Sequence, residues 1–238
     1  MQSHWIERDV TGSMMPAYVA EPDGTPKSGV IIIEEIFGVN ETIQAIADLI
    51  AREGYLAIAP NFFHRTDPHF DAGHDEAGMA KGSAAASAVR FPDLVADLTA
   101  AGAYLRERLG PEARIGTWGF CFGGSVAFLS ATLPFTQCAV SFYGGQIASS
   151  HVPGRPPMIE IAAQLRAPIF FAFGGQDQHI PASEHAKIRK ALDARGKPYA
   201  FHVFPSEGHG FFRHGPDAND GARSVWPMVK SFLAKYLG

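Results

Sequence analysis

The sequence predicts a doubly wound α/β domain, with a mostly parallel sheet and helices on both of its faces. Two observations support this fold class. Short apolar runs rich in β-branched and aromatic residues, such as 30–33 and 168–173, alternate along the chain with segments whose apolar residues recur at helical spacing. The apolar runs are also continuous, as expected for strands that are buried on both faces. Since neither a linker nor an internal repeat interrupts this order, residues 1–238 are expected to form one domain.

The first half of the chain contains three predicted strand regions and two predicted helices. The strand regions are 4–21, where one or two edge strands are expected, 30–33 and 55–59. Asn40 can cap the first helix, which Gly54 ends, and the second helix begins at Asp93. The section 61–92 carries prolines and glycines among many polar residues, so we expect an irregular excursion over the surface there.

The second half of the chain continues the alternation of strands and helices. The predicted strands are 114–118, 138–142, 168–173 and 199–204. The predicted helices are 125–131, a helix that starts near Pro181, and a closing helix that packs through Val225, Met228, Val229, Phe232 and Leu233. Residues 144–167 are interpreted as a second excursion, with a short helix expected near 159–165.

The overall composition argues against several classes of protein. The formal net charge of -4 offers no basic field for a nucleic-acid backbone. No apolar run is long enough to span a bilayer, and the N-terminal residues lack the apolar stretch of a signal peptide. The two cysteines, Cys121 and Cys138, are too few for a disulfide scaffold and suit a reducing compartment. We therefore expect a cytoplasmic monomer or small homo-oligomer, with neither nucleic-acid nor membrane partners.

The segment 117–124, Thr-Trp-Gly-Phe-Cys-Phe-Gly-Gly, joins a predicted strand to a predicted helix. Gly119 and Gly123 flank Cys121 as G-x-C-x-G, the nucleophile-elbow pattern with sulfur in place of a hydroxyl. The two glycines remove side chains that would collide in such a sharp turn. The pattern predicts a thiol at a helix N-terminus, where the helix dipole favours the thiolate. The alternative is a buried, inert cysteine.

A thiol nucleophile needs a neighbouring base, because a free cysteine is only a few per cent thiolate at neutral pH. His209 lies between two glycines in the loop after the strand 199–204, and Asp177 lies in the loop after the strand 168–173. The order of nucleophile, acid and histidine along the chain is one that accompanies the elbow motif. We therefore predict that His209 is the base and that Asp177 orients its imidazole. The alternative is that both are ordinary turn residues.

Four scattered segments carry a family resemblance. They are 35–40 (E-I-F-G-V-N), 119–124 (G-F-C-F-G-G), 174–177 (G-G-Q-D) and 208–211 (G-H-G-F). Together they resemble the dienelactone hydrolase family, also called carboxymethylenebutenolidases, a cysteine branch of the α/β-hydrolases. The resemblance implies the α/β-hydrolase fold and the hydrolysis of a lactone or an ester. It also implies that Cys121 is the nucleophile, His209 the base and Asp177 its orienting partner.

The resemblance assigns a further role to Glu35, which would help to deprotonate Cys121 when substrate arrives. A carboxylate at the end of a buried strand could accept that proton. The alternative is that Glu34 and Glu35 form a solvated acidic pair. An oxyanion hole requires two backbone donors, for which the peptide N–H groups of Ile36 and Phe122 are the candidates.

The resemblance also implies that Arg213 pairs with a substrate carboxylate and that Tyr143 lines the substrate pocket. An exposed arginine is the alternative for Arg213. The family's second carboxylate-binding arginine comes from the segment before the long helix. Here that segment, 72–90, is rich in alanine and glycine and does not align, so Lys81 and Arg90 are the candidates to replace the arginine. The expected substrate is a small lactone or ester, with or without a carboxylate.

Three histidines, His64, His69 and His74, recur every five residues among acidic side chains and are of the type that binds divalent metals. A polar loop is the better interpretation, because no helical spacing or rigid frame supports them, and we expect neither a metal nor another cofactor. The favoured hypothesis is a cysteine-dependent hydrolase. The alternatives are a non-catalytic domain that binds a small ligand in the same pocket and a metal-dependent hydrolase that uses this loop.

Overall fold

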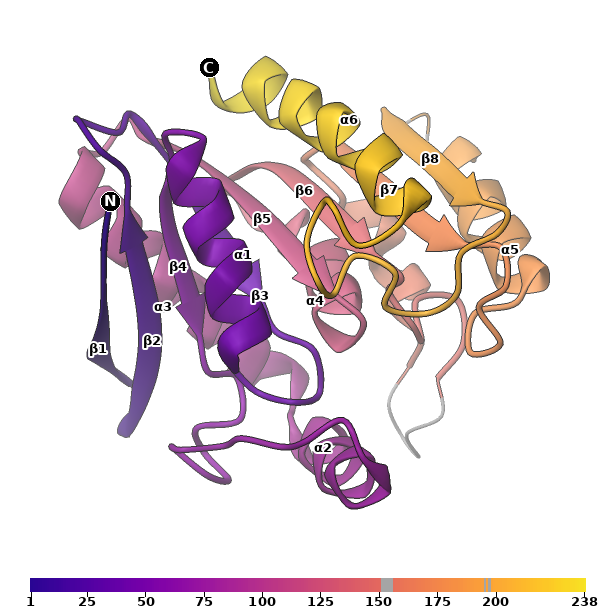
Figure 1. The fold of residues 1–238 in the computed structure, drawn as a ribbon, viewed down its shortest axis with the longest axis horizontal. Coiled ribbons are helices and arrows are strands. Elements are labelled where there is room, and N and C mark those ends of the chain that lie inside the picture. Colours follow the sequence, from indigo (N-terminus) through magenta and orange to yellow (C-terminus); the bar gives the residue numbers. More distant parts are fainter. Residues whose placement is uncertain (151–155, 195, 197) are drawn as a thin grey trace. The chain divides into compact units, whose positions relative to one another are not determined.

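The computed structural model describes residues 1–150, 156–194, 196 and 198–238 (Figure 1). The contacts between Cα atoms divide the chain into two compact units, Met1–Gly116 and Thr117–Gly238. Strand β5 (Arg114–Phe120) crosses the boundary between them. The expectation that the whole chain forms one domain stays a prediction.

The first unit contains four strands in the order β1-β2-β4-β3. Their bounds are Gln2–Val10 for β1, Ser13–Glu21 for β2, Ser28–Ile33 for β3 and Leu56–Pro60 for β4. Strand β2 pairs antiparallel with both β1 and β4, whereas β3 and β4 are parallel. The expectation of edge strands over 4–21 is therefore wrong for β2, which lies between two partners and is buried over residues 15–20.

Three helices belong to the first unit: α1 (Glu41–Arg52), α2 (Glu76–Ala88) and α3 (Phe91–Leu109). As expected, the Asn40 side chain caps α1 by accepting the N–H groups of Thr42 and Ile43. Helix α1 buries its isoleucines against β2, β3 and β4, and α3 packs against β1, β3 and β4. Figure 1 shows α1 in front of these strands and α3 behind them.

Helix α2 lies where the sequence predicted only an irregular excursion over 61–92, so that prediction is wrong for 76–88. Alanine is the best helix former, and Asp75 caps the helix by accepting the N–H of Gly78 at 2.8 Å. The buried positions are Gly78, Gly82 and Ala85, which lie three and four residues apart. The helix was missed because its buried face consists of glycine and alanine, which produce no pattern of large apolar residues.

The second unit holds the strands β5-β6-β7-β8 in that order, with β6 (Thr136–Phe142), β7 (Ile169–Gly174) and β8 (Tyr199–Phe204) parallel to one another. The helices are α4 (Phe122–Ser130), the 3₁₀ helix η1 (Met158–Gln164), α5 (Ala182–Asp193) and α6 (Asp220–Leu237). The predicted order of elements in this half is confirmed, including the short helix near 159–165.

Helix α6 packs against β6 and β7 through Val225, Val229 and Leu233. Met228 was expected in the same contact but is 40% exposed, so its assignment to the core is wrong. Pro227 also lies inside this helix. Within the described ranges, no helix combines the length and the apolar content that crossing a membrane would require.

Candidate active site

Cys121 lies in the turn between β5 and α4, as the elbow pattern predicted. Its backbone has φ 53° and ψ -113°, a conformation that is uncommon for a residue with a side chain. The peptide N–H of Cys121 donates to the Phe142 carbonyl at 3.0 Å, and the N–H of Gly124 donates to the Cys121 carbonyl at 3.0 Å. A Cβ on Gly119 would lie 1.8 Å from the Gly123 carbonyl oxygen. This turn is therefore sterically possible only with glycine at position 119.

The two cysteines have different environments. Cys138 is fully buried in β6, and burial raises the pKa of its thiol to about 12. Cys121 is partly exposed at the N-terminus of α4. A thiol that is buried and protonated is inert, whereas a partly exposed thiol at a helix N-terminus can react. Only Cys121 therefore has the environment of a nucleophile.

Asp177 and His209 are joined by a hydrogen bond of 2.7 Å between Oδ2 and Nδ1. Asp177 follows β7, and its other oxygen accepts the peptide N–H groups of His179 at 2.8 Å and Ile180 at 3.3 Å. Burial of the Asp177 carboxylate raises its pKa, but the hydrogen bond and charge of His209 and the N–H of His179 outweigh burial and lower the pKa overall. The carboxylate is therefore ionised and holds the imidazole by Nδ1.

The imidazole of His209 also interacts with the Cys121 thiol. Burial alone would lower the pKa of His209, but the hydrogen bonds to Asp177 and Cys121, together with their charges, raise the pKa to about 10. A protonated imidazole beside the sulfur favours the thiolate. The structure thus brings Cys121, His209 and Asp177 together in the second unit, in the spatial order that the sequence predicted.

Two further aromatic rings flank His209. Tyr143 contacts it edge-on with a centroid distance of 5.1 Å, and His179 does so at 5.2 Å. Tyr143 is fully buried and has a positive φ of 37°. His179 was not singled out from the sequence, and its position two residues after Asp177 was the only signal that could have identified it.

Arg213 lies close to the same histidine. Its peptide N–H donates to the Gly210 carbonyl at 2.9 Å, and its guanidinium packs against Gly210, where an added Cβ would lie 2.8 Å from Nη2. Gly210 has φ +73° and directly follows His209. This tight turn places the guanidinium against the residue that follows His209, where a group that binds a substrate carboxylate would be useful.

The other predicted site residues are divided between the two units. Glu35 and Ile36 lie in the first unit, directly after β3, and Phe122 is the first residue of α4 in the second. Glu34 and Glu35 are both buried, so the interpretation as a solvated acidic pair is wrong. The Glu35 carboxylate lies 3.9 Å from Nε2 of His74.

Glu34 is completely buried at the end of β3. Its Oε1 accepts the N–H of Phe62 at 2.6 Å, while Oε2 is buried and meets no hydrogen-bond partner in the described part of the chain. Burial, only partly offset by the Phe62 N–H, and the nearby charge of Asp97 raise the pKa of Glu34 well above its ordinary value. Burial of Glu34 therefore favours its protonated form.

The candidates for a second carboxylate-binding cation have local partners. Lys81 donates to the Asp71 carbonyl at 2.8 Å and lies over the Phe70 ring. Arg90 forms a two-fold hydrogen bond with the Asp93 carboxylate at 2.7 and 2.8 Å. Because each cation is bound by a neighbour within the first unit, the structure does not support a role for Lys81 or Arg90 in binding a substrate carboxylate.

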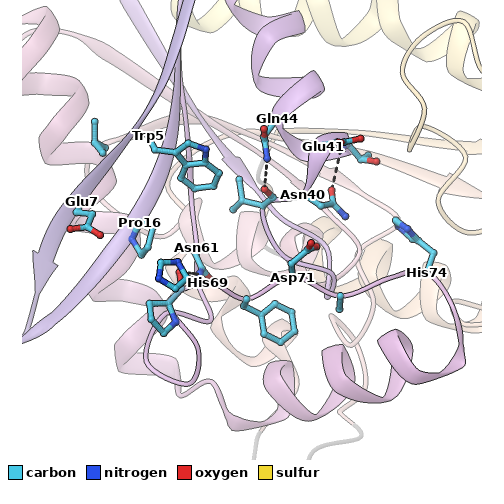
Figure 2. A pocket seen from close by; sticks show the side chains of 16 residues that line it. Trp5, Glu7, Pro16, Asn40, Glu41, Gln44, Asn61, His69, Asp71 and His74 are labelled. Atoms are coloured by element: carbon cyan, nitrogen blue, oxygen red, sulfur yellow. Dashed lines mark hydrogen bonds between the residues drawn. The ribbon is translucent and has the colours of Figure 1, made fainter.

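The three histidines proposed as alternative metal ligands do not converge. His64 is buried, and its ring contacts Ser13, Asp97 and Arg65. His69 and His74 line a surface pocket of the first unit, at opposite ends of the view in Figure 2. Among the residues that the structure describes, no three histidine, cysteine or acidic side chains form a group that could hold a metal ion. The donor set gives no support to the metal-dependent alternative.

Comparison with known proteins decides the family. The sequence model of the dienelactone hydrolase family matches residues 15–237. The chain belongs to the dienelactone hydrolase family. An Escherichia coli relative, named provisionally as a carboxymethylenebutenolidase, is 35% identical over 240 residues, which cover 95% of this chain and 84% of the relative. A Bradyrhizobium relative, named provisionally as a 2-oxo-3-(5-oxofuran-2-ylidene)propanoate lactonase, is 29% identical and covers 98% of this chain and 94% of its own length.

The structural comparison agrees with the sequence. The crystal structure of a provisionally named dienelactone hydrolase from Klebsiella pneumoniae matches with a TM-score of 0.86 and 30% identity, covering 99% of this chain and all of the other. The predicted α/β-hydrolase fold is thereby confirmed. The protein is a dienelactone hydrolase-like carboxylic-ester hydrolase, so the alternative of a non-catalytic binding domain is wrong.

Proposed function

We propose that this dienelactone hydrolase homologue opens lactone or ester bonds with Cys121 as nucleophile, His209 as acid and base, and Asp177 as the group that orients His209. One observation carries the proposal, the position of the His209 imidazole between the Asp177 carboxylate and the Cys121 thiol. A nucleophile, a base in contact with it and a third group that orients the base are the geometric requirements of this type of catalysis.

The first half of the reaction forms a thioester. When substrate arrives, the thiol proton passes to the Glu35 carboxylate, and the protonated His209 stabilises the resulting thiolate. The sulfur bonds to the carbonyl carbon, and the peptide N–H groups of Ile36 and Phe122 donate hydrogen bonds to the developing oxyanion. The bond to the leaving oxygen then breaks, and that oxygen takes the proton from His209.

The second half releases the product. The neutral His209 now removes a proton from water as the water oxygen bonds to the thioester carbonyl carbon. The sulfur leaves as thiolate, the product leaves as a hydroxy acid, and Glu35 returns its proton to the sulfur. One water is consumed, and each protein group ends in its starting state.

The proposed substrate is a small lactone or ester, and the chemistry near His209 favours one with a carboxylate. Support comes from the guanidinium of Arg213 beside Gly210 and from the lactonase name of the Bradyrhizobium relative. Arg213 can bind a carboxylate through two parallel hydrogen bonds, and Tyr143, whose buried ring contacts His209 edge-on, is the proposed apolar wall of the pocket.

Substitution of the two cysteines tests the nucleophile. Cys121→Ala should lose about 10³-fold or more in kcat for dienelactone and for simple aryl esters, because no thioester can form. Cys138→Ala is the matched control and should retain kcat, since its thiol is buried and protonated. Mass spectrometry of quenched reactions should detect the acylated protein only when Cys121 is present. Turnover that survives in Cys121→Ala would remove the mechanism.

A pair of substrates, one with a carboxylate and one without, tests whether Arg213 binds that carboxylate. We expect Arg213→Ala to raise KM at least tenfold for a lactone that carries a carboxylate and to leave the same lactone as its methyl ester nearly unchanged. Arg223→Ala, an exposed arginine on α6 that pairs with Asp220, is the control. Equal effects of Arg213→Ala on both substrates would assign Arg213 to folding or general packing.

A further inference from the structure

Glu207 precedes His209 by two residues and has no role in the proposed mechanism. It lies in the histidine loop, residues 205–213, which follows β8 and precedes α6 in the second unit (Figure 1). The residue is half-buried, and its Oε1 accepts the peptide N–H of Gly221, in the first turn of α6, at 3.0 Å. A helix leaves its first N–H groups without internal partners, and a carboxylate is a favourable acceptor at this positive end. The Glu207 side chain therefore fastens the histidine loop to α6.

The main chain of Glu207 is bound to the loop that carries Asp177. Its carbonyl accepts the peptide N–H of Gln176, the residue before Asp177, at 2.8 Å. The N–H of Glu207 donates to the Phe204 carbonyl, at the end of β8, at 3.1 Å. The Gln176 side chain makes a further link, because its Nε2 donates to the Pro205 carbonyl at 3.1 Å. Glu207 thus lies where the Asp177 loop, the histidine loop and α6 meet.

Glycines on two different elements allow this close packing around Glu207. A Cβ on Gly174, the last residue of β7, would lie 2.5 Å from the Glu207 carbonyl oxygen. A Cβ on Gly221 would lie 2.4 Å from Cγ of Glu207. Because non-bonded carbon atoms approach one another only to about 3.5 Å, a side chain at either glycine would displace Glu207. The position of Glu207 is therefore defined from β7 as well as from α6.

We infer that Glu207 is a positioning residue that holds His209 against Asp177. The inference rests on the proposed function, in which His209 is the acid and base and Asp177 orients it. The hydrogen bond of 2.7 Å between Asp177 and His209 joins their two loops through side chains, and Glu207 joins the same loops through its main chain. The Glu207 side chain contributes the bond to Gly221, so its removal frees the histidine loop from α6. A small displacement of a catalytic group is enough to slow the reaction.

Steady-state kinetics test the role of the side chain. Glu207→Ala should lower kcat about tenfold and change KM by less than about twofold, because the displaced loop carries a reacting group. Glu207→Gln keeps an oxygen that can accept the N–H of Gly221 and should retain kcat within about twofold. The controls are Ser206→Ala, an exposed neighbour in the same loop, and Glu184→Ala, which removes a carboxylate from the first turn of α5, and both should keep the wild-type kcat. Wild-type kcat in Glu207→Ala would overturn the inference, as would a Glu207→Gln as slow as Glu207→Ala.

Alkylation of Cys121 gives a measurement that does not depend on turnover. At pH 7, iodoacetamide should modify Cys121 about threefold more slowly in Glu207→Ala than in the wild type, because the imidazole is no longer held beside the sulfur. Glu207→Gln should react as the wild type does. Thermal unfolding of each variant shows whether a slower reaction reflects a loss of fold. An unchanged alkylation rate in Glu207→Ala would contradict a role in holding His209.

Gly221→Ala disturbs the same contact from the side of α6 and leaves Glu207 in the chain. Alanine is the better helix former, so this substitution should not weaken the helix. Its Cβ meets Cγ of Glu207 and should lower kcat about threefold or more when Glu207 is present. In Glu207→Ala that Cγ is absent, so adding Gly221→Ala should lower kcat no further. Additive losses in the double variant would overturn the inference.

The outcomes separate the role of Glu207 from the proposed function. If Cys121→Ala or His209→Gln keeps the wild-type kcat, the proposed function fails and the role of Glu207 fails with it. If both of those variants lose activity while Glu207→Ala keeps it, only the role of Glu207 is overturned. If Glu207→Ala slows turnover and alkylation and Glu207→Gln retains both, the two proposals are supported together.

Discussion

At the scale of single residues, the pair of His209 and Cys121 determines how the protein responds to pH. The pKa of His209 is raised to about 10, so between the ordinary histidine range and pH 10 the folded protein keeps a proton that the unfolded chain loses. The stabilisation from this proton is fully present below about pH 6.5 and is lost as the pH rises through 10.

Alkylation measures the effect of His209 on the Cys121 thiol. At pH 7, iodoacetamide should modify Cys121 about tenfold faster in the wild type than in His209→Gln, because an ordinary thiol is only a few per cent ionised at that pH. His179→Gln, which keeps Asp177 and His209 in contact, is the control and should react as the wild type does. Equal rates in the wild type and His209→Gln would show that the imidazole does not ionise the sulfur.

Glu34 gives a prediction of the same sign that begins at a lower pH. Its pKa is raised by burial and by Asp97, so the folded state holds a proton that the unfolded state releases above its ordinary carboxyl range. The group therefore destabilises the fold progressively as the pH rises from about 4.5. We expect Glu34→Gln to become more stable than the wild type as the pH increases from 4 to 8, as measured by urea unfolding at each pH. A stability difference that is independent of pH would contradict a protonated Glu34.

At the scale of elements, helix α2 depends on a close approach to the proposed oxyanion loop. A Cβ on Gly82 would lie 2.2 Å from the Ile36 carbonyl oxygen. Alanine should stabilise an exposed helix position by about 1 kcal/mol relative to glycine, but Gly82→Ala must displace either α2 or the Ile36 peptide. We expect kcat to fall at least tenfold while helical circular dichroism is kept. The exposed substitution Ser83→Ala should leave kcat unchanged, and a fully active Gly82→Ala would show that the Ile36 peptide tolerates the shift.

The same helix shows where sequence reasoning succeeds and where it stops. Strand β3 and helix α1 were predicted because their buried positions are large apolar residues with a clear period. The buried face of α2 is made of Gly78, Gly82 and Ala85, which carry no such signal. Residues that belong to a fixed local motif, such as Cys121, could be identified from the sequence. Contacts between segments that are distant in the chain, such as that of His74 with Glu35, leave no pattern in the sequence.

At the scale of the whole molecule, the open question is whether the two units unfold together. Trp118 and Trp226 stack in the second unit at 5.8 Å, whereas Trp5 of the first unit is 51% exposed. In Trp5→Phe, fluorescence therefore reports the second unit alone. If the chain is a single domain, the urea midpoint from fluorescence should equal the midpoint at which the amides of β3, in the first unit, lose protection from hydrogen exchange. Two separate midpoints would show two domains.

The burial of Cys138 has a consequence for the oxidation of Cys121. The chain has two cysteines, and the one in β6 is buried and protonated across the physiological range. Peroxide should therefore convert Cys121 first to a sulfenic acid, with no resolving thiol in the same chain to trap it as a disulfide. Recovery then depends on small thiols supplied by the surroundings, and in their absence a second equivalent of peroxide should oxidise Cys121 irreversibly to the sulfinic acid.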